Sequence, residues 1–279
     1  MKLLRFGRKG QEKPGILDHD GRIRDLSSVV SEINGEVLAG QLDKIKNTDL
    51  SILPIVDAQT RLGPCVAGIG KFICIGLNYS DHAAETGAEV PIEPVVFNKW
   101  TSAVVGPNDD VEIPKNSLKT DWEVELGVII GKDGRYISKE QAMEYVAGYC
   151  VINDISERAF QLEGTGTWDK GKGCDTFGPT GPWLVTKDEI ENPHNLNIWL
   201  EVDGHRYQDG NTSTMIFDIP TIVSYLSQFM SLRAGDVIST GTPPGVGLGQ
   251  KPPVYLKAGQ VMRLGIDGLG EQQQKVVSA

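Results

Sequence analysis

Two glutamates, separated by one residue, lie where a stretch of alternating acidic and apolar residues gives way to an apolar run. Glu123 and Glu125 lie in the run DWEVELGVII, residues 121–130, a pattern typical of a strand that enters a core. Side chains alternate between the two faces of a strand, so both carboxylates point to one side and Trp122 and Val124 to the other. Carboxylates this close in a partly dry site need a shared proton, a basic partner or a metal ion. A solvated strand face that carries acids is the alternative interpretation.

A third acid, Asp154, follows another apolar, β-branched stretch that begins near Tyr149. Taken alone, Asp154 fits an Asx turn or a helix N-cap better than a metal site. Together with Glu123 and Glu125 it would form a hard, all-oxygen site, which suits Mg²⁺ or Mn²⁺ better than Zn²⁺. Three carboxylates would leave coordination positions for water and substrate.

A candidate general base lies upstream, in the segment GLNYSDHAAETG at residues 76–87. There a predicted strand runs into a Gly-containing turn and a short helix. His82 and Glu85 are three residues apart, which places them on one face of a helical turn, where the carboxylate can orient an imidazole that acts on water. An exposed pair at this spacing is the structural alternative, and only the acidic residues downstream favour catalysis.

Further polar side chains could hold an anionic substrate. Arg158 and Gln161 follow the third acid, and Lys172 lies in the Gly-rich segment 168–179, predicted to be a loop. A lysine supplies compact positive charge for a carboxylate or enolate, although surface lysines explain the segment more simply. Thr242 lies in a loop after a predicted strand, where hydroxyls and amides could bind oxyanions. Neither a Walker motif nor a dinucleotide fingerprint is present, so nucleotide binding has little support.

The net charge of the chain limits the classes of binding partner that can be expected. The formal net charge of −10 argues against nucleic acid and anionic membranes, and the expected ligand is a small anionic molecule held by local cations. No apolar run approaches the roughly 18 residues of a membrane-spanning helix, and the opening MKLLRFG is too short and polar for a signal peptide. A cytoplasmic location is therefore expected.

The elements that must position these residues are mostly short strands. The 33 glycines and 15 prolines indicate many tight turns. The N-terminal part predicts a strand at 2–6, a hairpin around 18–21 and a helix at 27–33. A Gly- and Pro-rich stretch before residue 70 suggests a small N-terminal domain, 1–66, and a catalytic domain, 67–279.

Beyond residue 71 the pattern predicts strands alternating with turns, and two helices. The strands are expected at 72–75, 95–98, 124–130, 149–153, 197–202, 236–239 and 260–266, the Asp-Gly hairpins at 132–134, 202–204 and 266–268, and the helices at 138–146 and 220–230. Because strands and helices do not alternate regularly, the expected fold class is α+β, a mixed β-sheet roll.

Five segments in this order resemble the fumarylacetoacetate hydrolase superfamily: GLNYSDHAAE, DWEVELGVIIGKDGRYI, NDISERAFQ, WDKGKGCDTFGPTGPWLV and ISTGTPPGVG. The resemblance implies a mixed β roll with a small N-terminal domain, a homodimer, Mg²⁺ or Mn²⁺, and chemistry on 2-keto acids. It also implies roles for the residues named above: Glu123, Glu125 and Asp154 as metal ligands, His82 and Glu85 as the water-activating pair, Lys172 as the cation near substrate oxygens, and Arg158, Gln161 and Thr242 as substrate contacts.

Within the superfamily, the opening residues 1–27 most resemble bacterial hydrolases of 2,4-diketo-3-deoxy sugar acids from rhamnose or fucose breakdown. The expected reaction is therefore hydrolysis of a carbon–carbon bond in a 2,4-diketo acid, which gives pyruvate and a carboxylic acid. Oxaloacetate decarboxylation and ureidoglycolate cleavage are the enzymatic alternatives on the same scaffold. A metal-stabilised binding module is the non-enzymatic one.

Overall fold

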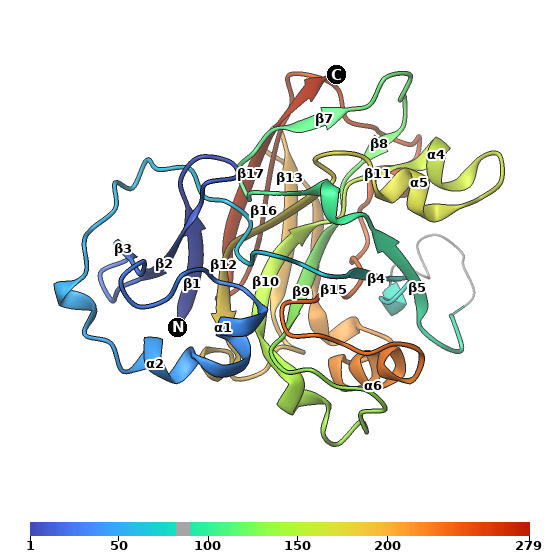
Figure 1. The fold of residues 1–279 in the computed structure, drawn as a ribbon. Helices are drawn as coiled ribbons and strands as arrows, with labels where there is room; N and C mark the ends of the chain where they lie inside the picture. The colour runs from blue at the N-terminus through green and yellow to red at the C-terminus, as the bar shows by residue number, and fades with distance from the viewer. Residues whose placement is uncertain (82–89) are drawn as a thin grey trace.

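A ten-stranded mixed sheet is the largest element of the fold in this computed structural model, which describes residues 1–81 and 90–279 (Figure 1). Its strands lie in the order β3 (Ile23–Asp25), β2 (Lys13–Leu17), β1 (Lys2–Phe6), β12 (Gly178–Thr186), β10 (Val146–Asn153), β9 (Val124–Ile130), β15 (Val237–Ser239), β4 (Phe72–Gly76) and β5 (Val95–Lys99), and β6 (Val104–Val105) pairs with β12. Most neighbours are antiparallel, and the pairs β15–β4 and β12–β6 are parallel.

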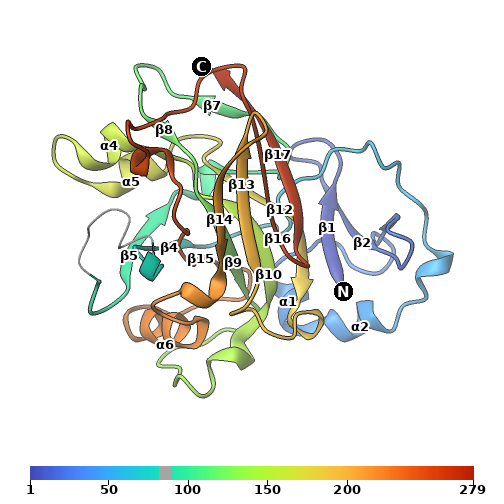
Figure 2. The ribbon, with the colours of Figure 1, turned by 180° about the vertical axis from the view of Figure 1, so that it is seen from behind.

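A five-stranded sheet packs on one face of the larger sheet and is in front in Figure 2. Its order is β14 (His205–Asn211), β13 (Asn197–Val202), β16 (Val261–Ile266), β17 (Gly270–Ser278) and β7 (Val111–Ile113). A two-stranded sheet joins β8 (Thr120–Asp121) to β11 (Ser156–Glu157). The predicted hairpins at 202–204 and 266–268 are the β13–β14 and β16–β17 turns.

The helices in the described part of the chain are short. They are α1 (Gly35–Gly40), α2 (Leu42–Lys46), α4 (Arg158–Leu162), α5 (Trp168–Lys172) and α6 (Ile219–Phe229), with 3₁₀ helices at Leu50–Ile52, Thr101–Ala103, Ala142–Tyr145, Lys187–Glu189, Thr212–Thr214 and Gly247–Gly249. Helix α6 confirms the prediction for 220–230. Asp218 caps it by accepting a hydrogen bond from the backbone N–H of Thr221, and Ile222 and Leu226 on its apolar stripe are buried.

Strand β9 separates two hydrophobic cores, which explains why all seven of its residues are buried. Val124 and Leu126 face the core between the two large sheets. Ile129 points to the opposite face, into a core shared with the N-terminal helices. Glu125 precedes Ile129 by four residues and therefore lies on that same face. The alternation of side chains along the strand thus places a carboxylate in the interior. The predicted alternation of residues 122–126 is confirmed.

The N-terminal strands β1–β3 extend the large sheet through the pairing of β1 with β12. The predicted hairpin around residues 18–21 is confirmed as the β2–β3 turn. The division of the chain near residue 66 stays a prediction, and strands from both sides of it share one sheet.

Three local predictions are wrong, and in two of them a long-range contact prevails over the local pattern. Residues 27–33 form a turn, closed by the bond from the Val30 N–H to the Leu26 carbonyl, and the helix starts only after the Asn34 cap. Residues 138–146 do not form an α-helix. A 3₁₀ helix covers only Ala142–Tyr145, and Ser227 of α6 accepts a bond from the Ile137 N–H just before the segment. Residues 132–134 do not make a hairpin, since Gly134 pairs with Leu232.

Candidate metal centre and active site

Glu123, Glu125 and Asp154 come together as one buried cluster. One carboxylate oxygen from each residue lies within 4.8 Å of the others. The register explains the meeting, because Ile152 of β10 lies opposite Glu125 of β9 and Asp154 is two residues further along β10's direction, on the same face. The Asp154 N–H also donates to the Glu123 carbonyl at 2.8 Å. The sequence-predicted acids therefore share one site.

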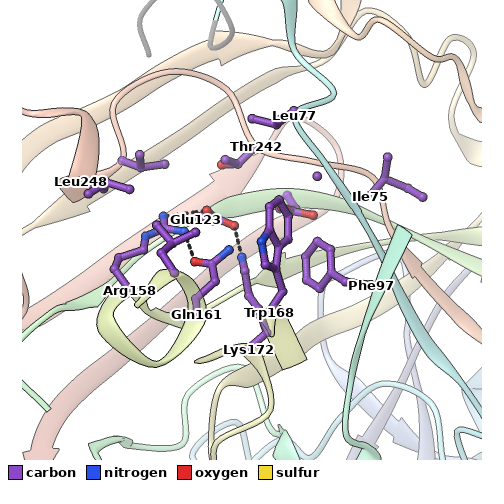
Figure 3. A pocket seen from close by; sticks show the side chains of 14 residues that line it. Ile75, Leu77, Phe97, Glu123, Arg158, Gln161, Trp168, Lys172, Thr242 and Leu248 are labelled. Atoms are coloured by element: carbon purple, nitrogen blue, oxygen red, sulfur yellow. Dashed lines mark hydrogen bonds and ion pairs between the residues drawn. The ribbon is translucent and has the colours of Figure 1, made fainter. Parts of the chain in front are cut away.

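Two cations hold one of the glutamates. The Lys172 ammonium lies 2.6 Å from Glu123 Oε2 (Figure 3). It also lies 2.9 Å from Asp154 Oδ2. The Arg158 guanidinium donates to Glu123 Oε1 at 2.7 Å. Burial opposes ionisation of Glu123, but the charges of Lys172 and Arg158 outweigh it and lower the pKa of Glu123 to about 2. Glu123 is thus a carboxylate at neutral pH.

Glu125 has a different environment. Its Oε2 accepts bonds from the Ser239 hydroxyl at 2.6 Å and from the Gly241 N–H at 2.8 Å, and no cation among the described residues forms an ion pair with it. Burial raises the pKa of Glu125 well above its usual range, and the nearby charges of Asp154 and Glu123 raise it further. Glu125 is the carboxylate of the cluster that most needs a positive charge.

Lys172 is positioned by α5, although the sequence predicted a Gly-rich loop there. Burial alone would lower the pKa of the Lys172 ammonium, but Asp154 and Glu123 raise it above its usual value, so the side chain stays charged. The helix fits against α4 because Gly171 has no side chain: a Cβ there would lie 2.4 Å from the Glu157 carbonyl oxygen. The predicted cation is next to two of the predicted ligands.

A second buried lysine, Lys99, was not predicted. Its ammonium lies 2.5 Å from Asp154 Oδ1 and donates to the carbonyls of Ile155 at 2.8 Å and Lys172 at 2.5 Å. A signal was available, because Lys99 is two residues after the buried Phe97 on β5 and therefore shares its inward face. The predicted strand ended one residue too early to include it.

Asp121 is another site residue that sequence reasoning did not assign. Its buried carboxylate accepts from Arg158 Nε at 2.8 Å and from the N–H groups of Gly247 and Leu248 at 2.6 and 2.9 Å. It therefore ties the guanidinium to the loop that follows β15. Local sequence gives no indication of this contact, since the Asp121 and Gly247 partners are 126 residues apart.

The three predicted substrate contacts all line one cavity of about 220 Å³, together with Glu123, Glu125 and Lys172 (Figure 3). Arg158 Nη1 donates to Gln161 Oε1 at 3.0 Å, which leaves the amide nitrogen of Gln161 as a donor. The Thr242 hydroxyl donates to the Val124 carbonyl at 2.8 Å and accepts from Gln208 Nε2 at 2.7 Å. Their assignment as substrate contacts stays a prediction.

The predicted water-activating pair, His82 and Glu85, lies outside the described residues. The segment that precedes this pair in the sequence contacts the cavity, because Gly76 and Leu77 contribute to its lining. Asn78 fixes this turn by donating to the Thr240 carbonyl at 2.7 Å and by accepting from the Phe217 N–H at 2.8 Å. The catalytic role of the pair stays a prediction.

The carboxylate cluster fits a divalent cation. All three ligands are oxygens, the donor type that Mg²⁺ and Mn²⁺ prefer. Within the described chain, Asp154 Oδ1 is buried and receives no hydrogen bond of good geometry, although the Lys99 ammonium is close. Glu125 lacks a cationic partner in the same part of the chain. A cation would satisfy both groups.

Comparisons with known proteins show the family of this chain. The family model described as fumarylacetoacetate (FAA) hydrolase, C-terminal, matches residues 71–277. The chain belongs to this family. A relative from Burkholderia multivorans is 63% identical, with 98% of each chain covered; its name offers hydrolase activity as a conjecture and gives no substrate. None of the described helices is long and apolar enough to cross a membrane.

Solved structures of other family members are similar over the whole chain. Fumarylacetoacetate hydrolase from Exiguobacterium antarcticum is 36% identical with a TM-score of 0.90, and each chain is fully covered. Maleylpyruvate hydrolase from Sphingobium sp. SYK-6, solved with manganese(II) and pyruvate, is 28% identical with a TM-score of 0.84 and the same coverage. A 2-hydroxyhepta-2,4-diene-1,7-dioate isomerase from Mycobacterium marinum is 30% identical over 100% of this chain and 98% of its own, with a TM-score of 0.79. The predicted family and α+β fold are confirmed, in a family that contains hydrolases and isomerases.

Proposed function

We propose that this fumarylacetoacetate hydrolase family member is a divalent-metal-dependent hydrolase that cleaves a carbon–carbon bond in a 2,4-diketo acid. The products are pyruvate and a carboxylic acid. The observation that carries the proposal is the buried cluster of Glu123, Glu125 and Asp154, which opens into a cavity and has the Lys172 ammonium at its edge. The related hydrolase solved with manganese(II) and pyruvate supports the metal and the product.

The cluster would hold Mg²⁺ or Mn²⁺ through Glu123, Glu125 and Asp154. A divalent cation bound there supplies Lewis-acid stabilisation for negative charge on the 2-keto acid. The Lys172 ammonium adds a fixed positive charge 2.6 Å from Glu123, at the same end of the cavity. The free amide N–H of Gln161 can donate to a substrate oxygen.

In the proposed reaction, His82, oriented by Glu85, takes a proton from water while the water oxygen bonds to C4 of the substrate. The C3–C4 bond then breaks, and its electron pair stays on C3 of the pyruvate fragment as an enolate. The proton held by the imidazole returns to C3. One water is consumed, and the former C4 carbonyl becomes the carboxyl group of the second product.

The assembly and the biological setting follow as proposals. The enzyme is proposed to act as a homodimer on a small anionic 2-keto acid in the cytoplasm, within carbohydrate catabolism. Gel filtration with light scattering tests the dimer, since a mass near twice the 30.3 kDa of the chain is expected.

A substrate panel separates the proposed reaction from the alternatives. Metal-stripped protein is incubated, with and without Mn²⁺, with an acylpyruvate, a 2,4-diketo-3-deoxy sugar acid, oxaloacetate, ureidoglycolate and a 2-hydroxyhepta-2,4-diene-1,7-dioate. Metal-dependent pyruvate from the first two compounds supports the hydrolase. Pyruvate from oxaloacetate alone would indicate a decarboxylase, glyoxylate with urea a lyase, and a shifted double bond without cleavage an isomerase.

A further inference from the structure

The backbone N–H and carbonyl of Val124, the residue between the two glutamates, are bound by side chains from distant parts of the chain. The pairing of β9 with β15 covers Gly127 to Ile129 and ends before Val124. Beyond that point the Thr242 hydroxyl donates to the Val124 carbonyl at 2.8 Å, and the Val124 N–H donates to Gln208 Oε1 at 2.9 Å. Two side chains thus take the place of a strand partner.

A third hydrogen bond closes these contacts into a ring. Gln208 Nε2 donates to the Thr242 hydroxyl oxygen at 2.7 Å, so the glutamine amide joins both groups that hold Val124. The same nitrogen donates to the Pro243 carbonyl at 2.9 Å. The Gln208 side chain is fully buried, so water cannot replace these bonds when the amide is removed.

The ring bears on the carboxylate cluster because Glu123 and Glu125 are the two neighbours of Val124 in the chain. Trp122 and Glu123 lie between β8 and β9 and belong to neither strand. The Glu123 N–H donates to another side-chain amide, Asn153 Oδ1, at 3.3 Å. A displacement of Val124 would therefore move the two carboxylates relative to each other, and partners behind the ligands are what hold a metal site in its geometry.

We propose that Gln208 is a positioning residue of the metal centre, which fixes the spacing between the carboxylates of Glu123 and Glu125. It acts through Thr242 and Val124, because it does not itself line the cavity. The inference rests on the proposed function, since it takes both glutamates as metal ligands. It also gives the Thr242 hydroxyl a role in the site, because its proton is directed at the backbone of β9.

The metal affinity of Q208L tests the role of the amide. Leucine has a side chain of similar size without polar atoms, so the ring loses two of its three hydrogen bonds. In a calorimetric titration without substrate, Mn²⁺ should bind Q208L at least about tenfold more weakly than the wild type. Wild-type affinity in Q208L would overturn the inference.

A matched control separates positioning of the ligands from a general loss of stability. S227A removes a buried hydroxyl that accepts from the Ile137 N–H, at a position outside the cavity lining and the carboxylate cluster. Both variants leave a buried backbone N–H without its acceptor, so both should unfold more easily in urea. S227A should nevertheless keep the wild-type Mn²⁺ affinity. An equal loss of affinity in S227A and Q208L would assign the effect to destabilisation and overturn the inference.

Variants of Thr242 keep the inference testable if Q208L does not fold. T242V retains the shape of threonine without the hydroxyl, whereas T242S retains the hydroxyl. Mn²⁺ should bind T242V at least about tenfold more weakly than the wild type, and T242S should bind it as the wild type does. In the double variant Q208L/T242V the loss of binding free energy should be smaller than the sum of the two single losses, because both changes open the same ring. Wild-type affinity in T242V, or additive losses, would contradict the ring.

These titrations contain no substrate, so they separate the inference from the proposed reaction. If the variants bind Mn²⁺ weakly but no diketo acid releases pyruvate with the wild type, the proposed function fails and the inference stands. If the variants bind Mn²⁺ as the wild type does while diketo acids are hydrolysed, the inference fails and the proposed function stands. A wild type that binds no Mn²⁺ would contradict both.

Discussion

Lys99 and Asp154 form an ion pair of 2.5 Å in which neither side chain is exposed. The protons of the Lys99 ammonium are directed at the carbonyls of Ile155 and Lys172, so one lysine holds a proposed metal ligand and the backbone of the neighbouring cation. Lys99 does not line the cavity. It therefore acts as a positioning residue, behind the groups that would meet metal and substrate.

Replacing Lys99 by methionine should destabilise the metal-free protein by about 3–5 kcal/mol, because it leaves a buried carboxylate with one cation instead of two. Mn²⁺ should raise the melting temperature of K99M more than that of the wild type, since a bound cation supplies part of the lost charge. Urea unfolding and thermal melts with and without Mn²⁺ measure both effects. The exposed Lys257, changed to methionine, is the control. A loss below about 1 kcal/mol in K99M would argue against the positioning role.

Glu125 should be indispensable for metal binding because the cluster provides it with no other cation in the described chain. E125Q keeps an oxygen that can accept from Ser239 and Gly241 but removes the charge. Mn²⁺ should bind E125Q at least about 100-fold more weakly than the wild type. Calorimetric titration measures the difference, and the exposed Glu112, changed to glutamine, provides the matched control. Wild-type affinity in E125Q would remove this residue from the ligand set.

The proposed general base makes a prediction that separates an enzyme from a metal-stabilised binding protein. H82A should lose about 10²–10⁴-fold in kcat, because no positioned group then takes the proton from water. Its Mn²⁺ affinity should stay at the wild-type value. His205 is exposed on β14, and H205A should keep full activity. Unchanged kcat in H82A would assign water activation to another residue.

A charge cluster far from the cavity predicts a pH-dependent stability. Glu12 is 6% exposed and accepts from Arg61 at 2.8 Å, while Arg61 also binds Asp109. Burial opposes its ionisation, but the bond from Arg61 and the charge of Arg5 lower the pKa of Glu12 below its ordinary value of about 4.5. A lowered folded-state pKa stabilises the protein above the unfolded-state pKa, and this contribution is lost as the pH falls through the folded-state value.

E12Q should therefore unfold about 1.5 kcal/mol more easily than the wild type at pH 7, and the difference should shrink as the pH falls below about 4.5. Urea unfolding at pH 7, 5.5 and 4 follows the change. In the control E163Q, the lost carboxylate is 60% exposed, so its effect should be small at every pH. A difference for E12Q that is independent of pH would contradict the assigned cause.

The positions of the three acids could be predicted from sequence because strand parity is local, and their role as metal ligands stays a prediction. Glu123 and Glu125 share a face of one strand and Asp154 follows the neighbouring strand, so hydrophobic pattern and residue type were sufficient to propose the cluster. The helix α6 was predictable for the same reason, since its apolar stripe and N-terminal proline lie within eleven residues.

Contacts between distant segments were not predictable in this way. Asp121 contacts Arg158 and Gly247, which are 37 and 126 residues away along the chain. The 3₁₀ segment at 142–145 replaces a predicted helix because Ser227, more than 80 residues away, fixes the chain before it. The division of the chain near residue 66, predicted from a Gly- and Pro-rich stretch, stays a prediction, and β1 pairs with β12 across it.

Pyruvate release by metal-stripped protein tests the central claim most directly. The substrate is 2,4-diketo-5-hydroxyhexanoate, and wild type and E125Q are compared with and without Mn²⁺ in a lactate dehydrogenase-coupled assay. The expected result is pyruvate only from the wild type with Mn²⁺, in equal amount to the second acid product. Equal pyruvate release without metal, or from E125Q at the wild-type rate, would contradict a metal-dependent hydrolase built on this carboxylate cluster.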